Sequence, residues 1–279
     1  KETLYDTAFN SNSKLVLNLG MRGGYLDINN EGWFTPRMVL SYFPRAYLRE
    51  EGRLKRRLVE LRLGTGLYYQ PPFYREFRRL DGTLNTNVKA QKSVHALLGA
   101  DVYFSMWSRK SPFKFSVEAY YKYLWDVNPY QIQEVQIEYL ANNNARAYAY
   151  GIDFKVNGEF IPGIQSFLKF GFLSTKEDIL DDQYTRYFDA SGSEIFDPSQ
   201  AIDSSIVNPG FIPRPSDQLF NIGLLFQDRM PKVEALSASL SLLFGTRLPY
   251  GPPNSQRYQD TLRSPSYLRV DLGIAYNFM

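Results

Sequence analysis

The stretch Tyr267-Leu-Arg-Val-Asp-Leu-Gly-Ile-Ala-Tyr-Asn-Phe278, close to the end of the sequence, carries the clearest structural signal. Its residues of even number are all apolar or aromatic: Leu268, Val270, Leu272, Ile274, Tyr276 and Phe278. The alternate positions are mostly polar or small: Tyr267, Arg269, Asp271, Gly273, Ala275 and Asn277. A period of two over this length predicts a β-strand with one apolar and one polar face. An edge strand of a soluble sandwich would also alternate, so the rest of the chain has to be considered.

The aromatic end of this terminal strand carries a second signal. The strand resembles the closing strand of a bacterial outer-membrane β-barrel, whose assembly signal reads polar, any, Gly, any, any, aromatic, any, aromatic. The signal positions are filled by Asp271, Gly273, Tyr276 and Phe278. The resemblance implies that the barrel assembly machinery binds this strand during membrane insertion.

The composition agrees with a barrel whose strands are half polar. The 279 residues are 44% hydrophobic with a mean hydropathy of −0.36, and no apolar run approaches the ~18 residues of a membrane helix. An aromatic content of 16% suits strands and interfacial girdles. With 0 cysteines, a disulfide framework and a thiolate metal site are excluded. A net charge of +3 is too weak to indicate nucleic-acid binding.

Alternation along the chain predicts about ten strands. Each covers about 10 to 15 residues, whereas strands of soluble proteins usually have ~5–6 and tilted membrane strands need ~9–11. We therefore predict an all-β, transmembrane antiparallel β-barrel. The expected spans are 14–27, 34–43, 57–70, 93–106, 113–126, 146–160, 164–176, 217–228, 235–247 and 266–278.

The connections between these strands alternate in length. The short ones are 108–112, 161–163 and 229–232, and the long polar ones are 71–92, 127–145, 177–216 and 248–265. In outer-membrane barrels, short turns are periplasmic and long loops extracellular. The segment 44–56 falls on the short-turn side but is long and basic, and we expect a solvated turn there. No domain boundary is visible.

Several segments are similar to the C-terminal half of TonB-dependent outer-membrane receptors. The matching segments are Gly64-Thr-Gly-Leu-Tyr-Tyr-Gln-Pro-Pro72, Glu118-Ala-Tyr-Tyr-Lys-Tyr123, Tyr150-Gly-Ile-Asp-Phe154, Pro213-Arg-Pro-Ser-Asp217, Phe244-Gly-Thr-Arg-Leu-Pro249 and the terminal strand. The resemblance implies an energised importer. In that family a plug domain fills the barrel, substrate binds from outside, and an inner-membrane complex pulls the plug through TonB.

The sequence departs from that family in two respects. It shows no plug and no TonB-contacting segment, and such transporters have about 22 strands. A ten-strand half would leave two unpaired edges in lipid, where backbone groups cannot be satisfied. We expect a C-terminal portion of a larger barrel, or a chain completed by a companion chain. A complete ten-strand barrel is the competing interpretation. No signal peptide precedes Lys1, which fits cleavage or a longer protein.

Neither catalysis nor a cofactor is expected. His95 is the only histidine, and Asp101 on the same face lies about 20 Å along the strand, too far to be its partner. The acidic segments 176–182 and 189–194 offer possible calcium ligands without the spacing of an EF-hand, so solvated loops are favoured.

Two groups of residues are candidates for binding. In the long loops, aromatic and arginine side chains suit recognition of a substrate or partner, although they could equally rest on the interfacial belt or on neighbouring loops: Phe73, Tyr74, Arg75, Phe77, Arg78, Arg79, Tyr130 and Tyr139. On the lumen side, four polar residues could contact substrate or plug: Arg22, Arg62, Gln70 and Lys122.

These observations predict the outer-membrane barrel region, residues 1–279, of a TonB-dependent transporter in a Gram-negative bacterium. It would import a siderophore, cobalamin, glycan or peptide, and lipid would contact its strands. Two alternatives stay open. One is a receptor-like structural subunit that scaffolds a surface lipoprotein or an assembly complex. The other is a small self-closed barrel, either a porin or an enzyme.

Overall fold

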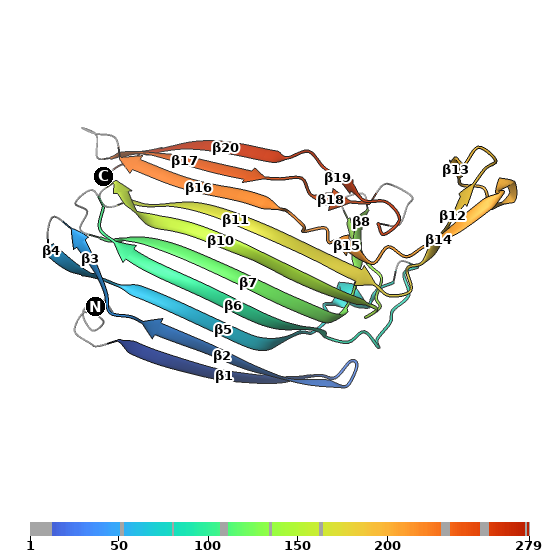
Figure 1. Cartoon of the computed structure of the whole chain (residues 1–279), viewed down its shortest axis with the longest axis horizontal. Helices are drawn as coiled ribbons and strands as arrows, with labels where there is room; N and C mark the ends of the chain where they lie inside the picture. Colours follow the sequence, from blue (N-terminus) through green and yellow to red (C-terminus); the bar gives the residue numbers. More distant parts are fainter. Residues whose placement is uncertain are drawn as a thin grey trace.

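A computed structural model describes residues 13–50, 53–79, 81–106, 111–133, 136–161, 164–229, 235–251, 257–276 and 278. Its dominant feature is a single antiparallel sheet built on ten long strands (Figure 1). They are β1 (Lys14–Leu26), β2 (Glu31–Phe43), β5 (Val59–Gln70), β6 (Gln91–Phe104), β7 (Phe113–Val127), β10 (Ala145–Ile161), β11 (Ile164–Ile179), β16 (Phe220–Arg229), β17 (Leu236–Gly245) and β20 (Tyr267–Tyr276).

The strands follow one another in the sheet in their order along the chain, from β1 at one edge to β20 at the other. A short eleventh strand, β15 (Phe211–Pro213), pairs with the end of β11. Each of the ten predicted spans overlaps one long strand, so the predicted all-β, antiparallel architecture is confirmed. Among the described residues β1 and β20 do not pair with each other, so this sheet does not close on itself as a complete ten-strand barrel would.

The segment 44–56, expected to be a solvated turn, is instead a β-hairpin. β3 (Ala46–Glu50) pairs with β4 (Arg53–Arg57) from Ala46↔Arg57 to Glu50↔Arg53. The physical reason is continuity. β2 and β5 are already neighbours in the sheet, so a chain that leaves one and returns into the other keeps pairing beyond their ends.

Strand register gathers the apolar residues on one face of the sheet. Directly opposed residues of neighbouring strands share a face, so a row of pairs can be followed across the sheet. One such row crosses eight strands and is apolar throughout: Leu17, Leu40, Leu63, Leu98, Ala119, Ile152, Phe172 and Phe220. A parallel row continues it to the last strand through Ile222, Phe244 and Leu268.

This apolar face is open to the surroundings rather than packed as a core. Leu19 is 73% exposed and Leu272 82% exposed. The chain exposes 18515 Å², whereas a compact globular protein of its 32.3 kDa mass would expose about 12,000 Å². A continuous exposed apolar surface of this extent marks an interaction with protein or membrane. No helix among the described residues is long and apolar enough to span a membrane.

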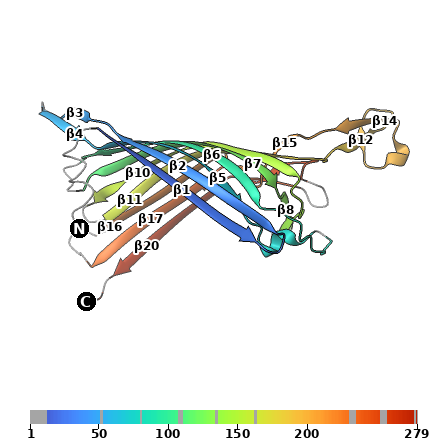
Figure 2. The ribbon, with the colours of Figure 1, turned by 90° about the horizontal axis from the view of Figure 1, so that it is seen from below.

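The sheet is curved, and its polar face is the concave one. Figure 2 shows an arch in which the strands of the two edges cross, as accumulated strand twist requires. The 3-10 helix η1 (Tyr74–Phe77) and the hairpin of β8 (Tyr130–Gln133) and β9 (Gln136–Tyr139) lie under this arch (Figure 2). Their side chains share a cavity with the polar face of β5, β6 and β7, which assigns that face to the concave side.

The two ends of the sheet differ. At one end the connections are short except for the β3–β4 hairpin, and at the other they are long except for the tight β1–β2 turn at 27–30. The long connections contain η1, β8–β9, η2 (Pro198–Gln200), the pair β18 (Pro249–Tyr250) and β19 (Leu262–Arg263), and an arm of β12 (Tyr184–Phe188), β13 (Glu194–Ile195) and β14 (Asp203–Val207) that projects away from the sheet (Figure 1). The predicted division into short turns and long loops is confirmed.

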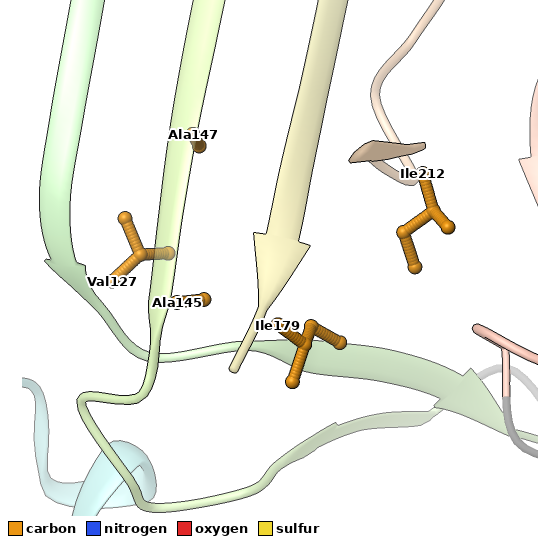
Figure 3. Close-up of a cluster of buried hydrophobic side chains, with 5 residues drawn as sticks. All are labelled: Val127, Ala145, Ala147, Ile179 and Ile212. Atoms are coloured by element: carbon orange, nitrogen blue, oxygen red, sulfur yellow. The ribbon is translucent and has the colours of Figure 1, made fainter. Parts of the chain in front are cut away.

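Buried hydrophobic side chains gather at the long-loop end. Val127, Ala145, Ala147, Ile179 and Ile212 form one cluster, contributed by β7, β10, β11 and β15 (Figure 3). Phe77, Val88 and Ala141 form a second cluster. These small cores hold the loops on the sheet, and among the described residues the rest of the ten-strand sheet has no comparable cluster.

Candidate binding sites on the concave face and in the long loops

The four residues predicted to face the lumen share the concave face, but they are not one site. Arg22 stands opposite Thr35 at the edge of the sheet. Arg62 belongs to an ion-pair network on β5 to β7. Gln70 and Lys122 line one cavity near the long loops. Their placement on the polar face agrees with the prediction, whereas contact with a substrate or plug stays a prediction.

The ion-pair network on the concave face is centred on Asp101. Its fully buried carboxylate lies 2.5 Å from the Arg62 guanidinium and 2.8 Å from the Lys114 amino group. Glu60 lies 3.7 Å from Arg62 and accepts a hydrogen bond from Ser41. Burial of a carboxylate carries a desolvation cost that a single ion pair often does not offset. Here two cations surround one carboxylate and together compensate that cost. Asp101 was not expected to be a partner of His95, and the structure shows that its carboxylate is instead bound by Arg62 and Lys114.

His95 stands among groups that do not form a catalytic arrangement. Its imidazole stacks on the Tyr68 ring at a centroid distance of 4.0 Å, and its Nε2 lies 3.0 Å from the Ser93 hydroxyl. Ser93 and His95 are two residues apart on one strand, so this contact follows from strand geometry. No carboxylate hydrogen-bonds to the ring in the described part of the chain to orient it as a general base.

A cavity of about 670 Å³ lies on the concave face at the long-loop end, and we call it the concave cavity. Its floor is the polar face of β5, β6 and β7, and its roof comes from η1 and β8–β9. Tyr120, which lines the cavity, packs over Gly151 of β10, where an added side chain would lie 2.5 Å from the Tyr120 hydroxyl. Polar and aromatic side chains that line the cavity include Tyr68, Gln70, Glu76, Gln91, Tyr120, Lys122, Asn128, Tyr130 and Tyr139.

Glu76 is the most unusual member of the concave cavity. Its side chain is only 3% exposed, and one carboxylate oxygen, Oε2, has no hydrogen-bond partner. The other oxygen lies 3.5 Å from the Gln91 amide nitrogen. Burial raises the pKa of the Glu76 carboxyl. A concave site with aromatic walls and a few fixed polar groups is the usual form of a ligand site.

A second cavity of about 640 Å³ lies beside the first, and we call it the arginine pocket. Arg75, Arg78 and Arg79 line it together with Tyr139 and Glu138. The loop that carries the arginines is held in place: Asn128 donates a hydrogen bond to the Glu76 carbonyl at 3.2 Å, and the Asn85 amide donates to the Phe77 carbonyl at 2.7 Å. The structure thus brings together residues that the sequence only placed in two different loops.

The aromatic candidates separate into different environments. Tyr74 is 90% exposed and Phe73 is also exposed, so both can meet a partner. Phe77 is buried among Val88 and Ala141, and its ring anchors the loop instead of facing outward. Tyr130 and Tyr139 oppose each other across β8–β9 with ring centroids 5.7 Å apart, and both line the concave cavity.

Two of the acidic loop residues, Glu177 and Asp189, are bound by other groups of the chain. Glu177 is fully buried between Arg214, at 3.0 Å, and Arg257, with which it forms a very close ion pair. Burial lowers the pKa of Arg257 to about 10, so the guanidinium stays charged. Asp189 accepts hydrogen bonds from the backbone and hydroxyl of Ser191 within its own turn. Among the described residues, no three acidic or histidine side chains gather as metal ligands.

The terminal strand has one partner among the described strands. Asp271 pairs with Arg269 at 2.8 Å on the concave face, and Gly273 lies opposite Ser239. Tyr276 and Phe278 contact each other with ring centroids 4.9 Å apart, and Phe278 is 90% exposed. Both aromatic rings are therefore accessible at the end of β20, while their role in assembly stays a prediction.

Sequence reasoning missed the buried carboxylates that organise the loops. Glu177 and Asp217 bind arginines that follow them by several tens of residues: Arg214, Arg257 and Arg263. Their only local signal is the Pro213-Arg-Pro-Ser-Asp217 stretch, which is also one of the segments similar to outer-membrane receptors. Glu76 was missed because it stands as a single acid among arginines and aromatic residues.

No protein-family model and no curated protein sequence matches the chain. Solved structures with a similar fold include two bacterial proteins. One is the complex of FpvAI with pyocin S2, with a TM-score of 0.48 and 11% identity over 96% of this chain and 34% of that chain. The other is the pyoverdine outer membrane receptor FpvA of Pseudomonas aeruginosa PAO1 bound to pyoverdine, with a TM-score of 0.49 and 12% identity over 95% of this chain and 36% of that chain. The chain spans about a third of the length of these two chains.

Proposed function

We propose that this chain forms part of the β-barrel of a TonB-dependent active transporter in the outer membrane of a Gram-negative bacterium. The observation that carries the proposal is the unbroken apolar convex face opposite a polar concave face. Contact with lipid would remove the apolar side chains of every strand from water, whereas in an aqueous environment they would stay exposed. The Tyr121–Tyr150 and Tyr123–Tyr148 cross-strand pairs near the long loops fit the aromatic girdle of a membrane interface.

Among the described strands, β1 and β20 each have one unpaired edge, and these edges support completion of the barrel by further strands, from the same polypeptide or from another chain. A closed barrel is required in lipid because unpaired backbone groups cannot be satisfied there. In the complete protein, a plug would fill the polar concave side. Contact of Arg22 and of the Arg62–Asp101 network with the plug is part of this proposal, and the position of these residues on the concave face supports it.

Substrate recognition is proposed at the long-loop end, which would face the medium. The concave cavity offers tyrosine rings and amides, and the arginine pocket offers three cations. A nutrient such as a siderophore, cobalamin, glycan or peptide could use both sites together. Uptake would then be driven from the inner membrane through TonB, and the aromatic end of β20 would direct insertion by the assembly machinery.

The test is made on the full-length protein in its own outer membrane. Surface-exposed loops should be cleaved by protease added to intact cells, and loss of the gene and loss of TonB should abolish uptake of the same nutrient. A panel of labelled siderophore, cobalamin, glycan and peptide identifies the class. Membrane insertion with uptake that is unaffected by loss of TonB would refute active transport. Recovery of the protein in the soluble fraction would refute the barrel.

A further inference from the structure

The arm of β12, β13 and β14 carries a charge opposite to that of the whole chain. Residues 181–207 contain six acidic residues and one cationic residue, a net −5, whereas the whole chain carries +3. The acidic residues are Asp181, Asp182, Asp189, Glu194, Asp197 and Asp203, and the cation is Arg186. In both views the arm extends beyond the long-loop end of the sheet (Figures 1 and 2). A field of this sign attracts a basic partner to the arm.

A cavity of about 760 Å³ lies at the base of the arm, and we call it the arm-base cavity. Residues 178–183, which lead into β12, line it together with Asn208, Gly210 and Phe211, which follow β14. Arg146 also lines it, and this residue stands opposite Asp178 and two positions from Tyr148 on β10. Side chains two positions apart on a strand share a face, so the cavity lies on the convex side with Tyr148. It shares no lining residue with the concave cavity or the arginine pocket.

The arm-base cavity contains more negative than positive charge. Asp178 is paired with Arg146 at 2.7 Å, and Arg146 is the one cation among the described residues of the lining, so Asp181 and Asp182 have no counter-charge there. Asp182 is only 5% exposed, and its Oδ2 has no hydrogen-bond partner. A buried carboxylate in this state destabilises the fold until a donor reaches it, which the ammonium or guanidinium group of a ligand can do. The carboxylates are not gathered as metal ligands among the described residues, so an organic cation fits the cavity better than a metal ion.

The outer edge of β14 is open to a further strand. β14 pairs with β12 alone among the described strands, so its other edge is unpaired. Its first four residues are exposed, and the last of these, Ile206, is 75% exposed. The strand contains neither lysine nor proline, the residues that commonly prevent pairing at an edge. Because Asn208 lines the arm-base cavity directly beyond the end of β14, a chain paired along this strand reaches that cavity.

We propose that the arm binds a basic protein segment in extended conformation. The segment pairs with the outer edge of β14 and places a lysine or arginine side chain in the arm-base cavity, beside Asp181 and Asp182. In such strand addition, main-chain hydrogen bonds supply affinity and a side-chain pocket supplies selectivity. Because the cavity lies on the convex side, the partner sits beside the barrel and not over its lumen, so its binding does not depend on transport of a nutrient. A free polyamine would use the same carboxylates but has no backbone to pair with β14.

The experiment uses the full-length protein in a nonionic detergent and measures binding by fluorescence anisotropy. The probe is a fluorescein-labelled octapeptide that alternates lysine with threonine. Two modified peptides test the same contacts without altering the protein: one has acetylated lysines, and the other has every backbone nitrogen methylated and keeps its charge. The test variant is Asp181→Asn with Asp182→Asn. The matched control, Asp189→Asn with Asp197→Asn, removes the same charge from the arm outside the cavity, and asparagine keeps the side-chain acceptor of both turns.

We expect the test variant and each modified peptide to weaken binding about twentyfold or more, because each change removes charge-assisted or backbone hydrogen bonds. The matched control should change the affinity by less than about threefold, as exposed charges do. Equal affinities of wild type and test variant would overturn the inference, as would a wild type that does not bind the lysine peptide. Binding of the methylated peptide as tight as that of the unmodified one would overturn strand addition. Displacement of the peptide by an equal concentration of spermidine would overturn it in favour of a free polyamine.

Discussion

Replacing Leu240 with arginine tests whether the convex face lies in lipid. Leu240 is the fifth of ten residues in β17, and it stands opposite Phe226 on one side and Leu272 on the other. It therefore belongs at the middle of the apolar band. An arginine on the lipid face at the bilayer midplane costs about 2–4 kcal/mol, which is a factor of roughly 30 to 900 in the folding equilibrium.

The neighbouring residue provides the control. Ser241 lies on the concave face opposite Asp271, so Ser241→Arg places the same charge beside a carboxylate. We expect its effect on the free energy of unfolding to stay within about 0.5 kcal/mol. The full-length protein in lipid vesicles is titrated with urea and followed by tryptophan fluorescence. Leu240→Arg should lower the midpoint strongly and Ser241→Arg hardly at all. Equal effects of the two variants would refute the assignment of the convex face to lipid.

Three further variants test the terminal strand and the buried carboxylates. Replacing both Tyr276 and Phe278 with serine should remove the aromatic signal and reduce outer-membrane levels at least tenfold by immunoblot; unchanged levels would contradict the assembly role. Glu177→Gln leaves a buried guanidinium without its counter-charge, which costs about 3–5 kcal/mol and should speed amide hydrogen exchange in the loop before β20. Glu194→Gln, in an exposed ion pair worth about 0–1 kcal/mol, is its control and should change exchange little. Because burial raises the pKa of Glu76, the folded state binds this proton more readily than the unfolded state, so stability should increase as the pH falls from neutral toward the ordinary value of 4.5. Glu76→Gln should raise the thermal midpoint at pH 7 and remove that dependence, and a lower midpoint would contradict the assigned burial cost.

The strand pattern was predictable because its signal is local. In β7, alternation from Phe113 to Trp125 alone separates the two faces, and the register with β6 and β10 then confirms the separation. The same is true of β20, where every even-numbered residue from Leu268 to Tyr276 lies on the convex face. An alternation with a period of two involves only neighbouring residues, so it can be recognised in a single sequence.

The long-loop end was not predictable in the same way. Glu177 and Arg257 are 80 residues apart, and no local pattern connects them. For Phe77 the sequence left recognition and packing on neighbouring loops equally open, because its contacts with Val88 and Ala141 come from other parts of the chain. The hairpin at 44–56 was mistaken for a turn because its charges obscure the alternation, and only the pairing of β2 with β5 explains why it continues as strand.

The distribution of exposure across the convex face adds an argument about what completes the sheet. On β10 in the middle, Ile152 and Phe154 are half-buried between apolar neighbours on both sides, whereas Leu19 on β1 and Ile274 on β20 are mostly exposed. Cross-strand neighbours cover each other's flanks, so exposure rises where one neighbour is missing. The alternation of apolar and polar residues nevertheless continues on both edge strands, β1 and β20. A sheet that ended in water would gain nothing from apolar residues at its edge strands and would need charges or proline there to prevent pairing. We infer that β1 and β20 are built to be paired by further strands carrying the same alternation, and that the apolar band continues onto those strands.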